Sequence, residues 1–200
     1  RVGIKAWWES NSAKKLSWSG SVFTGTGGVF KRTSLEYGLS GKARFNSKFS
    51  VQYSVNISNQ KNQAGWAGDS TVTGNETIYF SRRDVKNVEN VVNIKYNFTN
   101  RMGITLRARH YWSKVNPLQF YELDGFGKVQ TPTYPFTQNV KQNYNYLSVD
   151  MIYNWQFAQG SFFSIVWKDI AESFNRNFEK NYIRNLYKTV NGPQFNSLSL

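Results

Sequence analysis

The ten residues Phe49-Ser-Val-Gln-Tyr-Ser-Val-Asn-Ile-Ser58 alternate without interruption between apolar and polar side chains. Successive side chains of a β-strand point to opposite faces, so this stretch predicts a strand with one apolar and one polar face. No stretch shows helical spacing of comparable strength, and the chain is predicted to be all-β. The same alternation recurs strongly over 92–98, 102–112 and 147–157, and more weakly over 2–9, 16–24, 34–45, 161–168 and a short final segment, 194–200.

The connections between these segments alternate in length. Short, polar, turn-forming segments fall at 11–15, 46–48, 99–101 and 158–160, and longer connections are expected at 26–33 and over much of 59–90, 113–143 and 169–194. An up-and-down meander produces this order when all tight turns lie at one end of the sheet. Outer-membrane barrels combine short periplasmic turns with long extracellular loops, so the order favours a transmembrane barrel.

Composition excludes several kinds of chemistry. The 200 residues contain no cysteine and a single histidine, His110, so a disulfide framework, a thiol nucleophile and a histidine-rich metal site are not expected. We predict no cofactor and no enzymatic activity for this chain. No apolar run reaches the roughly 18–20 residues of a membrane helix. The net charge of +13 instead indicates that negatively charged partners are to be considered.

Alternation alone is equally compatible with a soluble sandwich, whose apolar faces point inward. Two features favour a barrel with a watery lumen. The long charged side chains lie on the polar faces, and the apolar faces lack proline and charge. In addition, no strand carries the blunting features of a sandwich edge. We therefore predict an antiparallel up-and-down transmembrane β-barrel, of which about nine strands are visible.

Aromatic residues recur beside the tight turns. Such a ring of aromatics is typical of the bilayer interface, where amphipathic rings lie at the depth of the headgroups. The alternative is ordinary packing at strand ends. The predicted periplasmic girdle consists of Phe45, Phe49, Phe98, Phe157 and Phe162.

Basic residues recur on the polar faces. A cationic lumen wall would favour anionic solutes, phosphorylated glycans or an acidic plug segment. The alternative is that carboxylates from other parts of the barrel compensate this charge. The predicted basic wall consists of Lys42, Arg44, Lys95, Arg107, Arg109 and Lys168.

The segment 111–146 is the aromatic-rich candidate for binding or docking. Aromatic loops can stack on sugar rings or dock a partner protein, and they can equally form a self-packed plug over the mouth of a barrel. Its candidate residues are Trp112, Phe120, Tyr121, Phe126, Tyr134 and Phe136.

Two other functions are weighed and disfavoured. Nucleic-acid binding would need basic residues beside exposed rings, whereas here they lie mostly on opposite faces. A glycan hydrolase would need paired carboxylates across a sugar. The candidates for such a pair are Glu122, Asp124, Asp169 and Glu172, all on predicted loops, where carboxylates are mostly solvated.

Three hairpin segments resemble a known family. They are the hairpin Trp7-Trp-Glu-Ser-Asn-Ser-Ala-Lys-Lys-Leu-Ser-Trp-Ser-Gly20, the pair 79–84 and 92–99, and Trp155-Gln-Phe-Ala-Gln-Gly-Ser161 with Val166-Trp167. The last is similar to a W-x-F-A-P-G-S-x-x-x-x-V-W hairpin, with Gln159 in place of proline. The family comprises outer-membrane proteins of Bacteroidota-type bacteria with an N-terminal carbohydrate-binding-module-like domain and a C-terminal barrel labelled a domain of unknown function.

The resemblance implies that residues 1–200 are the C-terminal part of one barrel domain, with an N-terminal region and the end of the last strand outside this sequence. It implies the outer membrane of a Gram-negative bacterium, with lipid and lipopolysaccharide as surroundings and other outer-membrane or periplasmic proteins and glycans as partners. The expected function is a barrel module that anchors, transports or binds for a larger cell-envelope protein. The alternatives are a docking scaffold and, with less support, a glycan-active hydrolase.

Overall fold

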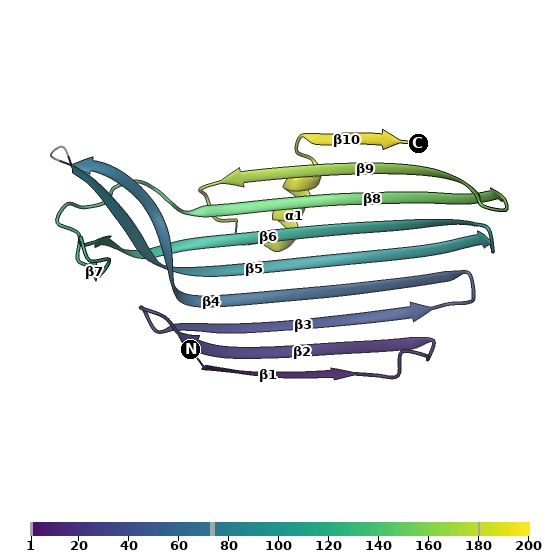
Figure 1. The fold of residues 1–200 in the computed structure, drawn as a ribbon, viewed down its shortest axis with the longest axis horizontal. Coiled ribbons are helices and arrows are strands. Elements are labelled where there is room, and N and C mark those ends of the chain that lie inside the picture. The colour runs from purple at the N-terminus through teal and green to yellow at the C-terminus, as the bar shows by residue number, and fades with distance from the viewer. Residues whose placement is uncertain (1, 73–74, 180) are drawn as a thin grey trace.

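The computed structural model describes residues 2–72, 75–179 and 181–200, and these form one antiparallel sheet (Figure 1). The strands follow one another across the sheet in the order β1-β2-β3-β4-β5-β6-β8-β9-β10, and β7 pairs only with β6. Every pairing is antiparallel between strands adjacent along this order. The all-β, up-and-down prediction is therefore confirmed, and the sheet is open.

The strand bounds are as follows. They are β1 Val2–Glu9, β2 Leu16–Gly27, β3 Arg32–Arg44, β4 Phe49–Val72, β5 Asn75–Thr99, β6 Met102–Leu123, β7 Val129–Gln130, β8 Gln142–Ala158, β9 Ser161–Asn175 and β10 Gln194–Ser199.

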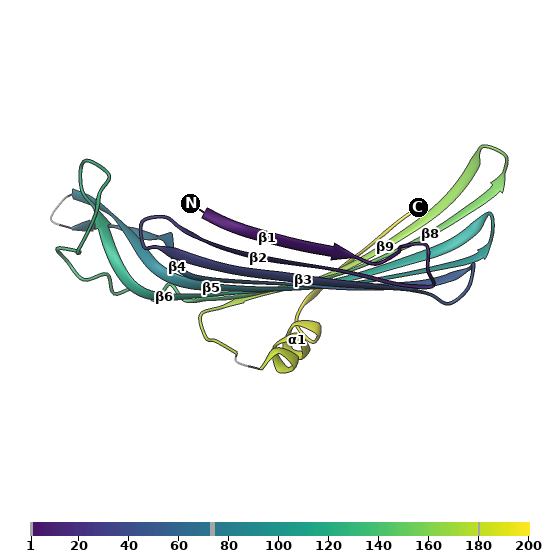
Figure 2. The same cartoon turned by 90° about the horizontal axis from the view of Figure 1, so that it is seen from below.

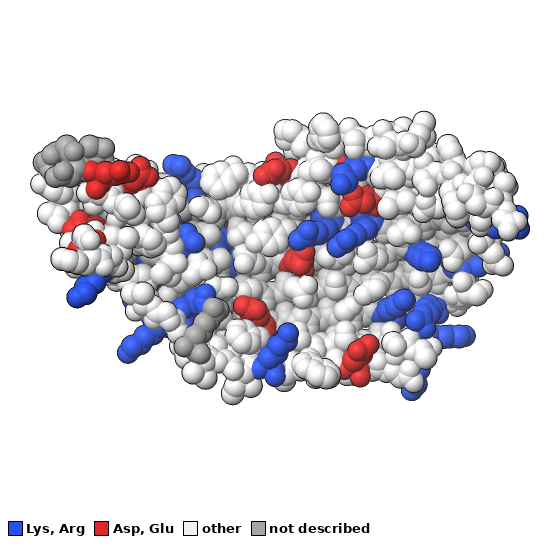
Figure 3. Space-filling model, in the orientation of Figure 1, with Lys and Arg blue, Asp and Glu red and all other residues white. Residues whose placement is uncertain are grey.

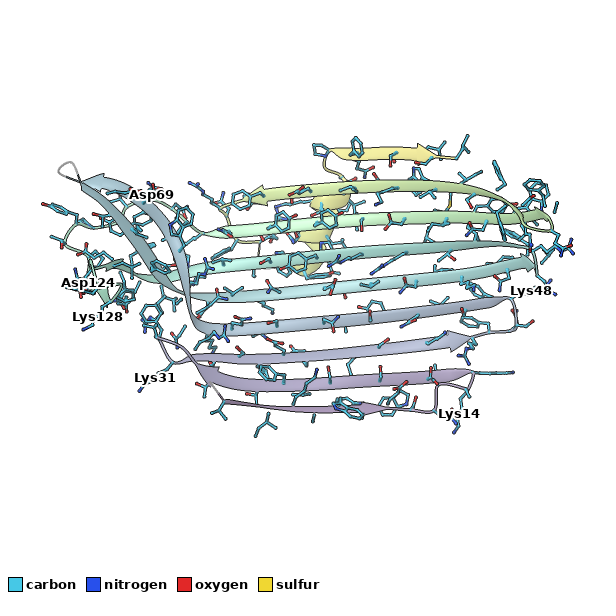
Figure 4. All side chains as sticks on the ribbon, viewed as in Figure 1. Lys14, Lys31, Lys48, Asp69, Asp124 and Lys128 are labelled. Atoms are coloured by element: carbon cyan, nitrogen blue, oxygen red, sulfur yellow. The ribbon has the colours of Figure 1, made fainter. Side chains whose placement is uncertain are left out.

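The four predicted tight turns all lie at one end of the sheet, where Lys14 and Lys48 are labelled in Figure 4. Side-chain hydrogen bonds and a glycine in a left-handed conformation stabilise these turns. The Asn46 side chain accepts hydrogen bonds from the backbone N–H groups of Lys48 and Phe49, both at 2.8 Å. Gly160 has φ +75°, a left-handed conformation that glycine adopts without steric cost. We call this the turn end, and the opposite end the loop end.

The loop end differs from the prediction. The expected long loops at 59–90 and 113–143 are largely strand, because β4, β5 and β6 run for 24, 25 and 22 residues. The pairing of β4 with β5 shifts between Gln60 and Gln63 and again between Trp66 and Gly68. Such bulges bend a strand and break its side-chain alternation, which explains why the extension is invisible to a period-two pattern. In Figures 1 and 2 this hairpin curves away from the rest of the sheet.

One helix, α1 (Tyr182–Val190), interrupts the predicted long connection before β10. The Asn181 side chain caps it by accepting a hydrogen bond from the backbone N–H of Arg184. The helix lies against one side of the sheet and is behind the strands in Figure 1 (Figure 2). It was not predicted from the sequence.

The register divides the sheet into two chemically different faces. We call the face that contains Leu39, Val55, Val92 and Val149 the apolar face, and the face that contains Ser40, Ser54, Arg109 and Ser148 the polar face. Large apolar side chains remain exposed on the apolar face from β1 to β9, among them Ile4, Trp18, Leu39, Tyr53 and Trp155. Helix α1 lies on this same face, since Tyr182 contacts Asn90 and His110, and both of these residues occupy positions of the apolar face.

Candidate functional site

The six predicted basic residues lie on the polar face, in three neighbouring rows. Cross-strand pairing places Lys42 opposite Gln52, Asn93 opposite Arg107, and Asp150 between Arg107 and Lys168. Arg44 and Lys95 belong to the next row toward the turn end, and Arg109 to the next row toward the loop end. We call these residues the basic band. Figure 3 shows this face, with Lys and Arg spread across the strands and acidic groups interspersed among them.

Two carboxylates on the same face neutralise part of the band. Arg109 Nε lies 2.6 Å from Glu89 Oε1, and Lys168 Nζ lies 3.5 Å from Asp150 Oδ1. Exposed ion pairs of this kind contribute about 0–1 kcal/mol each, so they hold side chains in place more than they stabilise the sheet. Within the described ranges, Lys42, Arg44, Lys95 and Arg107 make no ion pair, and the band keeps a net positive charge.

A hollow of about 540 Å³ continues the band to the turn end. Lys48, Lys95 and Arg101 line it together with the amides of Asn97, Asn154 and Gln156, and its lining includes no carboxylate. Cations and amide N–H groups without a competing carboxylate suit an anion rather than a cation.

A second hollow of about 540 Å³ lies further toward the loop end of the polar face. It combines Lys5 with the carboxylates Glu36 and Glu89 and with the rings of Phe23 and Tyr111. Its mixed charge does not select a single class of solute. The described residues contain no group of three or more His, Cys, Asp or Glu that could hold a metal ion.

The predicted aromatic girdle forms a row of ring contacts at the turn end. Phe45 stacks on Phe49 with ring centroids 5.0 Å apart, and Tyr96 meets Phe98 edge-on at 4.9 Å. Farther along the row, Trp155 and Phe157 lie 5.8 Å apart. Phe49, Phe98 and Phe157 lie at apolar-face positions of β4, β5 and β8, so the row of rings follows the turn end of the apolar face.

Phe162 departs from this row. It pairs with Gln156 and lines the basic hollow on the polar face, whereas its neighbour Phe163 pairs with Trp155 on the apolar face. The Phe-Phe doublet leaves the face undecided in the sequence, and the pairing of Phe162 with Gln156 places Phe162 on the polar face.

The aromatic candidates of the 111–146 segment differ in what surrounds their rings. Phe120 and Phe136 pack on each other with centroids 4.9 Å apart, and Tyr79 packs on Phe136 at the same distance. Tyr121 packs on Phe30, and Tyr134 is partly exposed, with its backbone oxygen accepting a hydrogen bond from the Tyr79 hydroxyl. Only Phe126 is almost wholly exposed, at 93%. Phe120, Tyr121 and Phe136 therefore pack on other aromatic rings of this chain.

Trp112 does not belong to the loop. It lies within β6, and α1 covers it with the Tyr182 ring at 5.6 Å. Its Nε1–H donates to Asn143 Oδ1 at 2.7 Å, so the ring is buried and satisfied. A binding role at the loop surface is thereby excluded for Trp112.

Glu122 fastens the 124–141 segment to the end of β6. Its carboxylate accepts hydrogen bonds from the Thr133 backbone N–H at 2.9 Å, the Thr133 hydroxyl at 2.8 Å and Gln130 Nε2 at 2.9 Å. The Thr133 backbone N–H contributes most to lowering the pKa of Glu122, followed by the Thr133 hydroxyl, because both favour the ionised form. The Glu122 carboxylate therefore has a structural role, because its hydrogen bonds hold Gln130 and Thr133 in place.

The four carboxylates weighed for hydrolysis are not gathered at one place. Asp124 Oδ1 accepts from the backbone N–H groups of Phe126 and Lys128 and so shapes its own turn. Asp169 and Glu172 belong to opposite faces of β9, as their partners Val149 and Tyr146 do in β8. Neither of the two hollows described above is lined by any of them.

Sequence reasoning missed a polar cluster on the apolar face. Asn90, His110 and Asn145 occupy apolar rows and contact α1. The signal was present in the sequence, because these polar residues occupy apolar-face positions in two neighbouring rows, Asn90 with His110 in one and Asn145 opposite Trp112 in the next.

Together these features define an all-β protein with an antiparallel meander sheet, an exposed apolar face and a basic band on the opposite face. No helix among the described residues is both long and apolar enough to span a membrane. The model of the family called domain of unknown function (DUF5916) matches residues 1–200, and the chain belongs to this family. Neither the curated proteins nor the solved structures contain a significant match.

Proposed function

We propose that this chain forms part of the wall of an outer-membrane β-barrel in a Gram-negative bacterium. The observation that carries the proposal is the opposition of the two faces. Large apolar side chains are exposed on one face from β1 to β9, and the other carries the basic band. A barrel whose apolar face meets lipid and whose polar face lines a watery lumen has this arrangement.

The dimensions of the apolar face support the same assignment. It runs from Phe49 to Ile57 in β4 and from Leu147 to Phe157 in β8. These spans agree with the roughly 9–11 residues that a tilted strand needs to cross a bilayer. Soluble monomers rarely expose contiguous apolar patches larger than a few hundred Å². The aromatic row at the turn end then lies at the periplasmic interface.

The strand order adds a constraint on closure. β1 and β10 lie at the two edges of a path of alternating antiparallel strands and run in the same direction (Figure 1). An all-antiparallel barrel has an even number of strands, so closing this sheet requires an odd number of further strands. We assign these to other parts of the same protein.

Within the cell envelope, the module anchors a larger protein and binds or passes a solute on its polar face. The uncompensated cations Lys42, Lys95 and Arg107 and the hollow around Lys48 and Arg101 fit an anionic solute, such as a phosphorylated glycan. Lipid and lipopolysaccharide surround the wall in this account. No catalytic step is part of the proposal.

Extraction of isolated cell envelopes with alkaline carbonate, followed by gel electrophoresis with and without boiling, tests the membrane assignment. The proposal predicts that the protein stays in the membrane pellet and that boiling changes its mobility. Release into the supernatant would mean that a soluble partner layer covers the apolar face.

A second candidate is a docking scaffold, with the barrel wall closed to solutes. The observation in its favour is the hairpin of β4 and β5 beyond the apolar span, together with the exposed rings Trp66 and Phe126 at the loop end. Conductance of the native protein in a planar bilayer separates the two. Channel activity supports transport, and a silent bilayer at every voltage supports the scaffold.

A further inference from the structure

Helix α1 packs on the sheet through polar side chains. The Tyr182 hydroxyl receives a hydrogen bond from Asn90 Nδ2 at 2.6 Å and lies 2.8 Å from His110 Nδ1. Asn185 and Asn145 exchange two hydrogen bonds, one of them 3.2 Å long from Asn145 Nδ2. Asn185 and Thr189 are almost fully buried beneath the helix. The inward side of α1 is therefore its polar side.

The outward side of α1 is apolar. Ile183 and Tyr187 are 69% and 68% exposed, and Val190 is also exposed. Their i, i+4, i+7 spacing places them on one stripe of the helix. A helix on a water-facing surface normally buries such a stripe and exposes its polar side, so α1 is inverted with respect to an aqueous environment.

The position of α1 explains the inversion. Toward the turn end, the next apolar-face residues along β5, β6 and β8 are Val92, Ala108 and Leu147. Beneath the helix the same strands carry Asn90 and His110, which pair with each other, and Asn145, which lies opposite Trp112 in the next row toward the loop end. The outward stripe of α1 thus places apolar side chains on the outside of these three polar residues, whose apolar-face neighbours Val88 and Trp112 are buried.

The flank of the helix is basic. Arg184 Nε and Lys188 Nζ lie 3.6 and 2.9 Å from Glu179 Oε2, and both side chains remain largely exposed. An apolar stripe with a tyrosine, flanked by basic side chains with long stems, is typical of a helix at headgroup depth.

We propose that α1 is an interfacial helix that lies in the bilayer surface on the outside of the barrel. Ile183, Tyr187 and Val190 contact lipid, and the helix separates the polar cluster of Asn90, His110 and Asn145 from it. Polar groups facing hydrocarbon without partners carry a large desolvation penalty, and α1 supplies the partners. The inference rests on the proposed membrane function and names the lipid contact of one element within it.

Single cysteines test the proposal, because this chain contains none of its own. Ile183→Cys probes the outward stripe, Leu39→Cys the apolar face and Ser12→Cys the exposed β1–β2 turn. Each variant of the native protein carries the fluorophore NBD in dioleoyl-phosphatidylcholine vesicles. Quenching is compared for aqueous iodide, for a lipid with a nitroxide near the headgroup and for one with a nitroxide near the chain end. Tyr187→Cys replaces Ile183→Cys if the latter does not fold.

The label at position 183 is expected to respond about twofold more strongly to the shallow nitroxide than to the deep one, and only weakly to iodide. If position 39 is quenched by the nitroxide lipids while position 183 responds to iodide as position 12 does, the outward stripe of α1 faces water and the inference is overturned. If position 39 also responds only to iodide, the membrane assignment itself fails.

Discussion

At the residue scale, the hydroxyl of Tyr182 is one of the two groups of α1 that bond the helix to the sheet, the other being the Asn185 amide. Tyr182→Phe removes the group that contacts Asn90 and His110 and leaves both without that partner. We expect the free energy for local opening of α1 to fall by about 1–3 kcal/mol. Amide hydrogen exchange over residues 182–190 measures this loss.

Tyr187→Phe is the matched control for that substitution. It removes a hydroxyl from the same helix at a position that faces outward. Exchange in this variant should match that of the parent protein. Equal protection in the two variants would contradict the role assigned to Tyr182.

A second residue-scale prediction concerns Glu122 and pH. Because hydrogen bonds to Thr133 lower its pKa in the folded state, ionised Glu122 stabilises the 124–141 segment. This contribution is complete above the ordinary pKa near 4.5 and is lost as pH falls through the lowered value. Protection of the Thr133 amide against hydrogen exchange should decrease along that course.

Glu122→Gln should abolish this pH dependence and weaken protection of the segment at neutral pH by about 1–2 kcal/mol. Glu76→Gln, an exposed carboxylate in β5 near the same end of the sheet, is the control and should leave protection unchanged. An acid-labile segment in Glu122→Gln would show that another group is responsible.

At the scale of elements, the turn between β8 and β9 depends on a left-handed residue. Gly160→Ala places a side chain on a residue with φ +75° and should destabilise this hairpin by about 1 kcal/mol. Gly41→Ala in β3 is the matched control, because a Cβ there meets open space. The urea midpoint of unfolding should fall for the first variant only; an equal shift for both would contradict a turn-specific effect.

The elements also show how far sequence reasoning reaches. Strict alternation from Phe49 to Ser58 predicts both the strand and its faces, since one face is uniformly apolar. The continuation of β4 escapes prediction because Asn62, at φ +55°, lies within a bulge that breaks the period. Helix α1 is not predicted because its polar residues point inward. The exposed stripe of Ile183, Tyr187 and Val190 can be interpreted only when the position of the helix on the sheet is known.

Site residues divide in the same way. Lys42, Arg107 and Lys168 could be assigned to a common face from parity alone, but only the register shows that they share one row with Asp150. Trp112 could not be placed from the sequence, since its burial depends on a helix some seventy positions further along the chain.

At the scale of the whole molecule, the basic band predicts a preference for anions in any open lumen. Lys95→Gln together with Arg107→Gln removes two cations without an ion-pair partner. The anion-to-cation permeability ratio should fall by about twofold. Reversal potentials under a salt gradient in a planar bilayer measure the ratio.

Lys14→Gln at the β1–β2 turn removes an exposed charge away from the band and is the control. A ratio that falls equally in the control and the double variant would assign the preference to the mouth of the barrel rather than to the band.

The central claim is that the apolar face meets lipid and the polar face meets water. A spin-label scan of single cysteines along β4, from position 49 to 58, tests it most directly in the membrane-embedded protein. The account predicts a period of two, with odd positions accessible to oxygen in the bilayer and even positions accessible to a water-soluble nickel complex. Accessibility to the nickel complex at the odd positions, or the absence of any period, would contradict it.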